Sequence, residues 1–302
     1  MRLKVNNYLM ESIKINKDTT ILNITDVHSN IKALKLIEKY IDTISIDYIV
    51  MVGDILDRHN LKNEDEFIDE LINLSKKKQL IISLGNHELY KYKQKDNITK
   101  KDILNSNYYK RLSKSKNIIM TLEDIKTITN KDIDITLLNM PDDYYDKKED
   151  INIFKKYMDK LDKENKLDSN KFNILLSHTP NPFIKKKKII NDYNLINNCD
   201  LILCGHNHAG LMPTFIQDIF NNHIGLFGPF NGILSKNAYG YWVNDNKTLL
   251  VSNGVTKLSN TSKVHFIRNF ISNTIYSIEI DLIQIKKANK NSFKLVNRKK
   301  IK

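Results

Sequence analysis

The sequence predicts a single α/β layered domain, and three observations support this prediction. The first two thirds of the chain alternate short apolar runs, typical of buried strands, with longer stretches whose apolar residues recur at helical spacing. From Gly225 onward the pattern changes to closely spaced strands, which suggests a second sheet that completes a sandwich. The length of 302 residues is enough to bury such a core, and no internal repeat or interdomain linker divides it.

Six apolar runs predict the strands of the first part, and four stretches predict its helices. The expected strands are Ile21–Thr25, Tyr48–Val52, Leu80–Leu84, Ile133–Met140, Phe172–Leu176 and Leu201–Cys204. The expected helices are Ser29–Ile44, which starts with a Ser29/Asn30 capping pair, Glu64–Lys77, Asn105–Lys114 and Asn152–Leu161. In the last third we expect strands at Tyr239–Val243, Thr248–Ser252, Val264–Phe270 and Thr274–Asp281.

The remaining segments are expected at the periphery. Tyr90–Lys131 and Asp142–Asn170 look like surface insertions between core strands, and their charge runs are typical of solvated helix faces. We expect residues 1–285 to form the domain and residues 286–302 to be a basic, frayed tail.

The composition excludes several classes of protein. Apolar residues make up 41% of the chain, too many for a disordered protein, and the two cysteines, Cys199 and Cys204, are too few for a disulfide-rich secreted fold. We expect both to be buried thiols. No run reaches the roughly 20 apolar residues of a membrane span, and no signal-peptide core follows Met1, so a cytoplasmic location is expected. The formal net charge of +13 favours anionic partners, although Lys and Asn are abundant throughout the chain.

Chemistry-bearing side chains follow five of the predicted strands. The motifs are Asp26-Val27-His28, Gly53-Asp54-Ile55-Leu56-Asp57-Arg58, Gly85-Asn86-His87-Glu88, Ser177-His178-Thr179-Pro180 and Gly205-His206-Asn207-His208. Turn residues that arise independently have no reason to alternate so regularly with buried strands. Because functional residues collect at the carboxyl ends of strands in α/β domains, the motifs predict one shared site.

These residue types predict a metal centre. Imidazole and carboxylate together suit manganese, iron or zinc, whereas the scarcity of Cys argues against a structural zinc site. A catalytic ion keeps a position open for water, so the candidates are too many for one ion and predict two, roughly 3.5–4 Å apart with a shared carboxylate. The candidates are Asp26, His28, Asp54, Asn86, His178, His206 and His208. Two carboxylates and a bridging hydroxide leave one positive charge, which a phosphoryl oxygen can neutralise.

Read in order, these five motifs closely resemble those of the calcineurin-like metallophosphoesterase family over residues 19–210. The resemblance implies a four-layer α-β-β-α sandwich of two mixed β-sheets, with two divalent metal ions at one edge. Manganese is favoured, with iron, zinc or nickel as alternatives. The resemblance also implies a division of the ligands into Asp26, His28 and His208 for the first ion, Asn86, His178 and His206 for the second, and Asp54 between them.

The same resemblance assigns roles beyond the ligands. It implies that His87 is the general acid that protonates the leaving group, and similarity to phosphoprotein phosphatases implies that Asp57 orients His87 and that Arg58 contacts phosphate. His59 stands where those phosphatases have Gly, and their later signature segments are missing, which argues against a protein phosphatase. The segment Ser252-Asn253-Gly254 looks more like the bacterial group of phosphodiesterases and lipid-sugar pyrophosphatases, whose membrane anchor this sequence lacks.

The leading hypothesis is hydrolysis of a small phosphorylated substrate, a phosphomonoester or phosphodiester, by attack of the bridging hydroxide on phosphorus. One alternative is a nucleic-acid-directed phosphodiesterase or nuclease that uses the basic surface. Another is a non-catalytic scaffold with the same fold, which the complete set of ligand positions disfavours.

Overall fold

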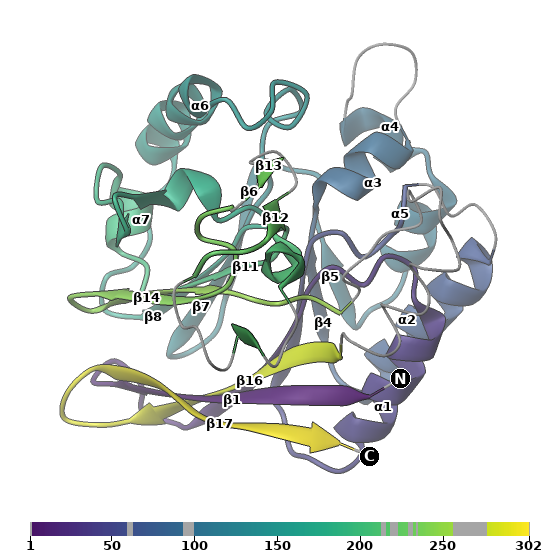
Figure 1. Cartoon of the computed structure of the whole chain (residues 1–302), viewed down its shortest axis with the longest axis horizontal. Coiled ribbons are helices and arrows are strands. Elements are labelled where there is room, and N and C mark those ends of the chain that lie inside the picture. The colour runs from purple at the N-terminus through teal and green to yellow at the C-terminus, as the bar shows by residue number, and fades with distance from the viewer. Residues whose placement is uncertain are drawn as a thin grey trace.

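In the computed structural model of the protein, two mixed β-sheets pack face to face, with helices on the outer face of each. The structure describes residues 2–58, 63–92, 100–212, 216–217, 223–228, 232–233, 235–255 and 277–301. Figure 1 shows α1 (Ile31–Ile41) and α2 (Glu64–Lys77) beside the larger sheet on the right, and α6 (Ile151–Glu164) and α7 (Asn194–Asn197) beside the smaller sheet at upper left. The predicted four-layer α-β-β-α sandwich is confirmed.

The larger sheet has seven strands. In spatial order they are β17 (Ser292–Ile301), β1 (Leu3–Ser12), β16 (Ile278–Lys287), β2 (Thr19–Ile24), β3 (Tyr48–Val52), β4 (Leu80–Ser83) and β5 (Ile118–Met120). From β2 to β5 the strands are parallel, so their carboxyl ends reach the same edge. On the other side of β2, β16 is antiparallel to β2 and parallel to β1, and β17 is antiparallel to β1.

The smaller sheet has six strands. In spatial order they are β14 (Gly240–Asn244), β15 (Lys247–Val251), β11 (Leu201–Cys204), β8 (Phe172–Leu176), β7 (Ile133–Leu138) and β6 (Ile125–Thr129). The four central strands are parallel and the two edge strands are antiparallel. The shorter elements are α3 (Asn86–Lys91), α4 (Lys100–Leu104), α5 (Asn107–Leu112), the 3₁₀ turns Asn181–Phe183 and His208–Leu211, and the strand pairs β9 (Ile184–Lys185) with β10 (Lys188–Ile189) and β12 (Phe227–Gly228) with β13 (Gly232–Ile233).

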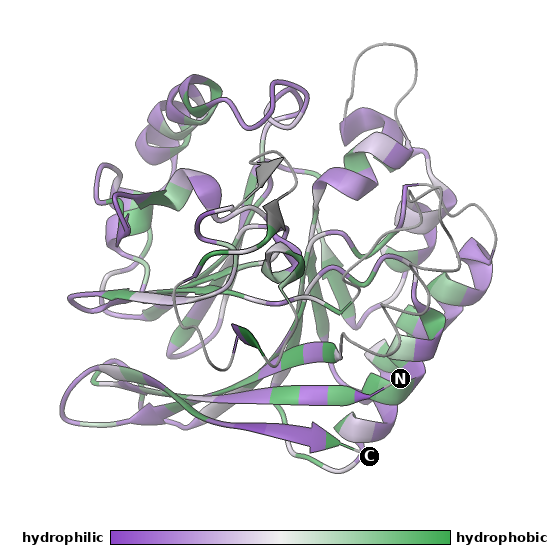
Figure 2. Ribbon diagram, viewed as in Figure 1, coloured by the Kyte–Doolittle hydropathy of each residue, from purple (hydrophilic) through white to green (hydrophobic). Residues whose placement is uncertain are grey.

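Alternation along each buried strand separates the layers. In β3, Ile49 and Met51 pack in the cluster that includes the helices, whereas Val50 and Val52 pack between the two sheets. Successive side chains of a strand point to opposite faces, so a continuous apolar run serves both interfaces. Figure 2 shows the same arrangement, with hydrophobic strands in the centre and hydrophilic outer faces on the helices.

Most of the predicted elements are present. The six strands of the first part correspond to β2, β3, β4, β7, β8 and β11, and the four helices correspond to α1, α2, α5 and α6. Cys199 and Cys204 are buried free thiols, as expected. In the described ranges no helix combines the length and the hydropathy needed to cross a bilayer. His59 and the expected strand Val264–Phe270 lie outside the described residues.

The predicted composition of the second sheet is wrong. The expected strands Tyr239–Val243, Thr248–Ser252 and Thr274–Asp281 do not share one sheet, because β14 and β15 lie beside β11 in the smaller sheet whereas β16 joins the larger one. The segment Tyr90–Lys131 is not wholly a surface insertion either. It contains β5 and β6, each of which forms an edge of one sheet.

The expected frayed tail over 286–302 is also wrong. Residues Ser292–Ile301 form β17, which pairs with β1, and β16 itself runs on to Lys287. Phe293 and Leu295 of β17 pack against the cluster between the sheets, and the Phe293 ring stacks on Tyr8 with centroids 5.3 Å apart and packs edge-on against Tyr241 at 5.0 Å. The segment is rich in lysine and was therefore not predicted as a strand, but Phe293 and Leu295, at alternate positions, anchor it to the fold.

A buried polar cluster lies on the inner face of β1, β16 and β2, and it makes stability depend on pH. Burial, with the charge of Glu279 adding to it, raises the pKa of Asp281 to about 6 from 3.8, although Asn6 and Asn23 donate hydrogen bonds to its carboxyl group. The folded-state pKa lies above the unfolded one, so protonated Asp281 stabilises the fold below about pH 4, and this stability is lost as the pH rises through about 6.

We expect Asp281→Asn to reduce this pH dependence. One pH unit of pKa difference corresponds to ~1.4 kcal/mol, so from pH 4 to pH 7 the wild type should lose about 2 kcal/mol more unfolding free energy than the variant. Urea unfolding of both proteins at the two pH values measures the difference. Stability profiles that run parallel for the two proteins would contradict the assignment to Asp281.

Candidate metal centre

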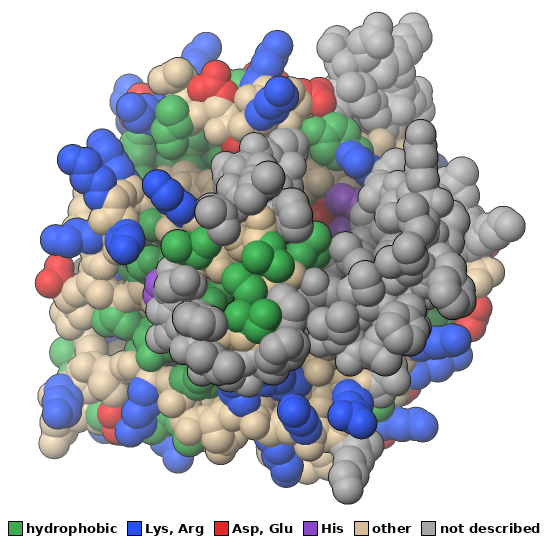
Figure 3. Space-filling view, viewed as in Figure 1, with side chains coloured by type: hydrophobic (Ala, Val, Ile, Leu, Met, Phe, Trp, Pro, Cys, Tyr) green, Lys and Arg blue, Asp and Glu red, His purple; other side chains and the backbone are tan. Residues whose placement is uncertain are grey.

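All seven predicted ligands follow the carboxyl ends of parallel strands, five in loops, Asn86 at the start of α3 and His208 at the start of a 3₁₀ turn. Asp26 and His28 follow β2, Asp54 follows β3 and Asn86 follows β4, while His178 follows β8 and both His206 and His208 follow β11. The carboxylates and imidazoles form two groups that share Asp54, one with Asp26, His28 and His208 and the other with His178 and His206. Within each group one candidate ligand atom per residue lies within 4.8 Å of the others. Figure 3 shows His and acidic atoms beside each other, set back from the surrounding surface.

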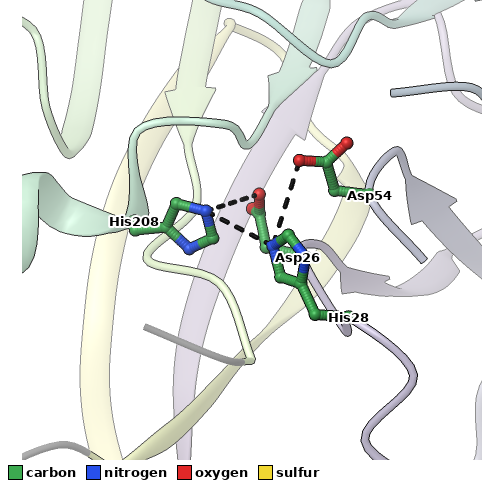
Figure 4. A group of neighbouring side chains, drawn as sticks. All are labelled: Asp26, His28, Asp54 and His208. Atoms are coloured by element: carbon green, nitrogen blue, oxygen red, sulfur yellow. Dashed lines mark hydrogen bonds and ion pairs between the residues drawn. The ribbon is translucent and has the colours of Figure 1, made fainter. Parts of the chain in front are cut away.

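The first group joins two imidazoles and two carboxylates (Figure 4). His28 Nε2 lies 3.4 Å from His208 Nε2 and 3.9 Å from Asp54 Oδ2. His208 Nε2 lies 3.6 Å from Asp26 Oδ1. Burial lowers the pKa of His28 well below its usual value, and the neighbouring His87 ring lowers it further. A neutral imidazole with a free lone pair is the form that binds a metal ion.

The second group is arranged around His178. Its Nε2 lies 3.2 Å from Asp54 Oδ2 and 3.2 Å from His206 Nδ1, and its Nδ1 lies 3.0 Å from the Val52 carbonyl oxygen. A carbonyl oxygen can only accept, so Nδ1 carries a hydrogen and Nε2 is the nitrogen left to bind an ion. Burial alone would lower the pKa of His178, but the Asp54 carboxylate raises it to about 10, so an ion that binds here displaces the Nε2 proton. Asn86 precedes His87, whose backbone N–H binds Asp54, and its Oδ1 is buried without a hydrogen-bond partner, which a bound cation would supply.

Asp54 is held with one oxygen directed at both groups. Its Oδ1 accepts a hydrogen bond from the His87 backbone N–H at 2.8 Å, while Oδ2 faces His28, His178 and the His87 ring. Burial alone would raise the pKa of Asp54, but His178 and the other imidazoles lower it well below its usual range. The carboxylate is therefore ionised and positioned between the groups.

Five of the candidate ligands have left-handed backbone conformations. The φ angles of Asp26, His28, Asp54, His206 and His208 lie between 46° and 72°. A residue with a Cβ occupies this region at a cost of the order of 1–2 kcal/mol, and such residues cluster at functional sites. The backbone is therefore strained at these positions, and this conformation directs the five side chains into the two donor groups.

Two motif glycines allow the close packing of the ligands. A Cβ on Gly53, which has φ of +71°, would lie 2.4 Å from Nδ1 of His178. A Cβ on Gly85 would lie 2.3 Å from both the backbone nitrogen and Oδ1 of Asp54. Neither position can hold a side chain without displacing a candidate ligand.

Glu88 fastens two of the motif loops together, a role that the sequence did not reveal. It accepts hydrogen bonds from the backbone N–H groups of Gly85 at 2.8 Å, Asp54 at 3.1 Å and Leu56 at 2.7 Å. Burial, followed by the charge of Asp54, raises its pKa to about 7. Glu88 is the last residue of the Gly85–Glu88 motif, and this position was the only sign of its role in the sequence. The three amides that Glu88 binds are brought together by the fold.

The predicted catalytic residues lie on the α3 side of the site. The His87 ring packs against His28 with centroids 4.4 Å apart, and its Nε2 lies 3.9 Å from Asp54 Oδ2. Its Nδ1 lies 3.7 Å from Asp57 Oδ1 and accepts a 3.3 Å hydrogen bond from the Arg58 backbone N–H. Burial lowers the pKa of His87, although the carboxylates of Asp54 and Asp57 oppose this effect. The structure thus places Asp57 at ion-pair distance from the ring and not at hydrogen-bond distance.

The Arg58 side chain is held against an aromatic ring. Its guanidinium carbon lies 5.2 Å from the centroid of the Tyr90 ring, within the range of a cation–π contact. Burial raises the pKa of Tyr90 to about 12, and Asp146 adds to the shift. Tyr90 is therefore a neutral phenol whose ring face contacts the guanidinium group of Arg58.

The segment Asp142–Asn170 contributes two buried side chains to the site, so the prediction of a surface insertion is wrong here. The Tyr145 ring lies 5.7 Å from the His206 ring and 6.5 Å from the His178 ring, and the side chain is 2% exposed. Glu149 Oε1 lies 3.3 Å from His206 Nε2. Burial alone would raise the pKa of Glu149, but His206 and its hydrogen-bond donors lower it. No local pattern in the sequence marks either residue, because only tertiary structure brings them to His206.

The sandwich and its paired donor groups define a metal-dependent hydrolase fold. A family profile described as calcineurin-like phosphoesterase matches residues 19–210, which contain every candidate ligand. The chain belongs to the calcineurin-like phosphoesterase family and is a phosphoester hydrolase. The family implies a dinuclear divalent metal centre, and the donor set with the unpaired Asn86 oxygen fits such a centre.

Solved structures show a more distant similarity. A dimetal phosphatase from Danio rerio is 12% identical, with 78% of this chain and 87% of that chain covered and a TM-score of 0.47. The NAD nucleotidase of Haemophilus influenzae is 14% identical, with 79% and 45% covered and a TM-score of 0.45. An archaeal phosphodiesterase is 9% identical, with 78% and 85% covered and a TM-score of 0.36. A search of curated protein sequences found no match.

Proposed function

We propose that the protein hydrolyses small phosphoric mono- or diesters with two divalent ions. Asp26, His28 and His208 would hold the first ion, and Asn86, His178 and His206 the second, with Asp54 shared. The observation that carries this proposal is the position of Asp54 Oδ2, which lies 3.9 Å from His28 Nε2 of one group and 3.2 Å from His178 Nε2 of the other. A single carboxylate oxygen that faces both donor groups is what a two-ion site requires.

Two ions bound here would activate water as a nucleophile near neutral pH and stabilise the charge that develops on the phosphoryl oxygens. The chain itself supplies the proton for the leaving group. His87 Nε2 faces the site, 3.9 Å from Asp54 Oδ2, and the ring acts as the general acid once Nδ1 is also protonated and exchanges the Arg58 N–H for Asp57. Asp57, 3.7 Å from Nδ1, stabilises the protonated ring, and Arg58 provides a cation for the phosphate.

The proposal extends to the metal, the substrate and the compartment. Manganese is favoured because carboxylate, amide oxygen and imidazole donors suit it, with iron, zinc and nickel as alternatives. Among the described residues, Figure 3 shows Lys and Arg side chains spread around this face and not gathered in one patch, and we propose a small substrate over nucleic acid. The two free, buried thiols agree with a cytoplasmic location.

Metal-dependent turnover tests the proposal directly. The chelated, purified protein is loaded in turn with manganese, iron, zinc or nickel and given an aryl phosphate or an aryl phosphodiester. We expect two ions per chain by elemental analysis and hydrolysis of at least one ester that is lost on chelation and restored by metal. A folded protein that holds two ions but shows no hydrolysis with any of the four metals would overturn the proposal.

A further inference from the structure

The orientation of the His206 ring distinguishes its two nitrogens. Nδ1 lies 3.2 Å from His178 Nε2, the atom that lies 3.2 Å from Asp54 Oδ2. Nε2 lies 3.3 Å from Glu149 Oε1. One nitrogen therefore faces the second donor group and the other faces a buried carboxylate.

Glu149 is itself held in place from several directions. Its side chain is 5% exposed, Thr179 Oγ1 donates a hydrogen bond to Oε1, and Asn181 Nδ2 donates one to Oε2. Its backbone N–H donates to the Tyr144 carbonyl at 2.9 Å, and both Lys148 and Glu149 have left-handed φ angles, of 53° and 61°. The backbone is strained at these two successive residues, and this conformation directs the Glu149 carboxylate toward His206.

A carboxylate in this position selects one tautomer of the ring. Neutral imidazole carries one hydrogen and one lone pair, and an ionised carboxylate can only accept a hydrogen bond. A hydrogen on Nε2 therefore leaves the lone pair on Nδ1, and carboxylates that orient ligand histidines in this way raise metal affinity. We propose that Glu149 is a positioning residue, which fixes His206 with Nδ1 directed at the second ion; this inference rests on the proposed function.

His178 is oriented by a different acceptor for the same purpose. The Val52 carbonyl fixes its hydrogen on Nδ1, so Nε2 faces the site, whereas in His206 the Glu149 carboxylate leaves Nδ1 facing the site. The two rings of the second group thus present opposite nitrogens to one point. The acceptor of His206 is charged and comes from a segment outside the five motifs.

Glu149→Ala and Glu149→Gln test this role through metal affinity. Competition with a chelator should show that Glu149→Ala binds the second ion ten- to a hundredfold more weakly, with the affinity for the first ion unchanged. Glu149→Gln, which keeps the shape and a neutral acceptor, should show a smaller loss. The matched control is Asp150→Asn, which removes the neighbouring charge and keeps a side chain that can cap α6. It should keep both affinities.

The tautomer gives a second readout that is independent of turnover. In the zinc-loaded wild type, histidine ¹H–¹⁵N spectra should show the His206 hydrogen on Nε2, and in Glu149→Ala this hydrogen should exchange rapidly with water. A wild-type hydrogen on Nδ1, unchanged affinity for the second ion in Glu149→Ala, or an equal loss in Asp150→Asn would overturn the role of Glu149. A wild type that binds fewer than two ions, or binds two and hydrolyses no phosphoester, would instead overturn the proposed function.

Discussion

Asp54→Asn is expected to abolish turnover and to weaken the binding of both metal ions. Its Oδ2 is the one carboxylate oxygen that faces both donor groups, and the amide removes the negative charge without changing the shape. Loss of a residue that only supports a ligand costs about ten- to a hundredfold in metal affinity. We expect the loss of a shared ligand to exceed a hundredfold for each ion, measured by chelator competition and elemental analysis.

Asp57→Asn provides the matched control for this experiment. It makes the same substitution three residues along the same loop, but Asp57 lies beside Nδ1 of His87 and away from the shared oxygen. We expect this variant to keep both ions. Two tightly held ions in Asp54→Asn would show that the bridging assignment is wrong.

His87→Ala is expected to separate catalysis from metal binding. The ring packs beside His28 and faces Asp54, but the proposal gives it a proton to donate and no ion to hold. Loss of a general acid typically costs a factor of about 10²–10⁴, so turnover should fall at least a hundredfold while the metal content stays at two ions per chain. Thermal unfolding and elemental analysis check that the fold and the centre are intact.

The leaving group provides a sharper test of the His87 role. An alkyl phosphoester expels a strongly basic oxygen that needs a proton, whereas a nitrophenyl ester expels a weakly basic one. The activity loss in His87→Ala should therefore be much larger for the alkyl ester. An equal loss for both esters, or unchanged turnover, would refute the role of general acid.

The candidate ligands could be predicted because each is encoded locally. A short apolar run predicts a strand, a polar motif follows it, and parallel strands bring such motifs to one edge. The structure places Asp26, Asp54 and His206 together in this way, although they lie far apart in the chain. The left-handed φ angles that direct these side chains could not be predicted, because Asp and His do not mark such positions as Gly does.

The residues that support the ligands could not be predicted for a different reason. Glu88 is useful because three backbone amides from two loops converge on it, and Glu149 because a turn before α6 passes beside His206. Neither relation depends on spacing within the sequence. Which strands belong to which sheet could not be predicted for the same reason. β17, for example, becomes a strand through its pairing with β1 and through the contact of Phe293 with Tyr8.

The pairing of β1 with β16 and β17 has a consequence for biosynthesis. Leu3 lies opposite both Ile278 and Ile301, so a ribosome must translate nearly the whole sequence before β1 can meet its neighbours. Until then β2, which leads into Asp26 and His28, lacks the neighbour that β16 provides, and a strand edge left open invites association with other chains. Contacts of such large sequence separation also slow folding. During synthesis, β1 and the β16-facing edge of β2 therefore stay unpaired longest.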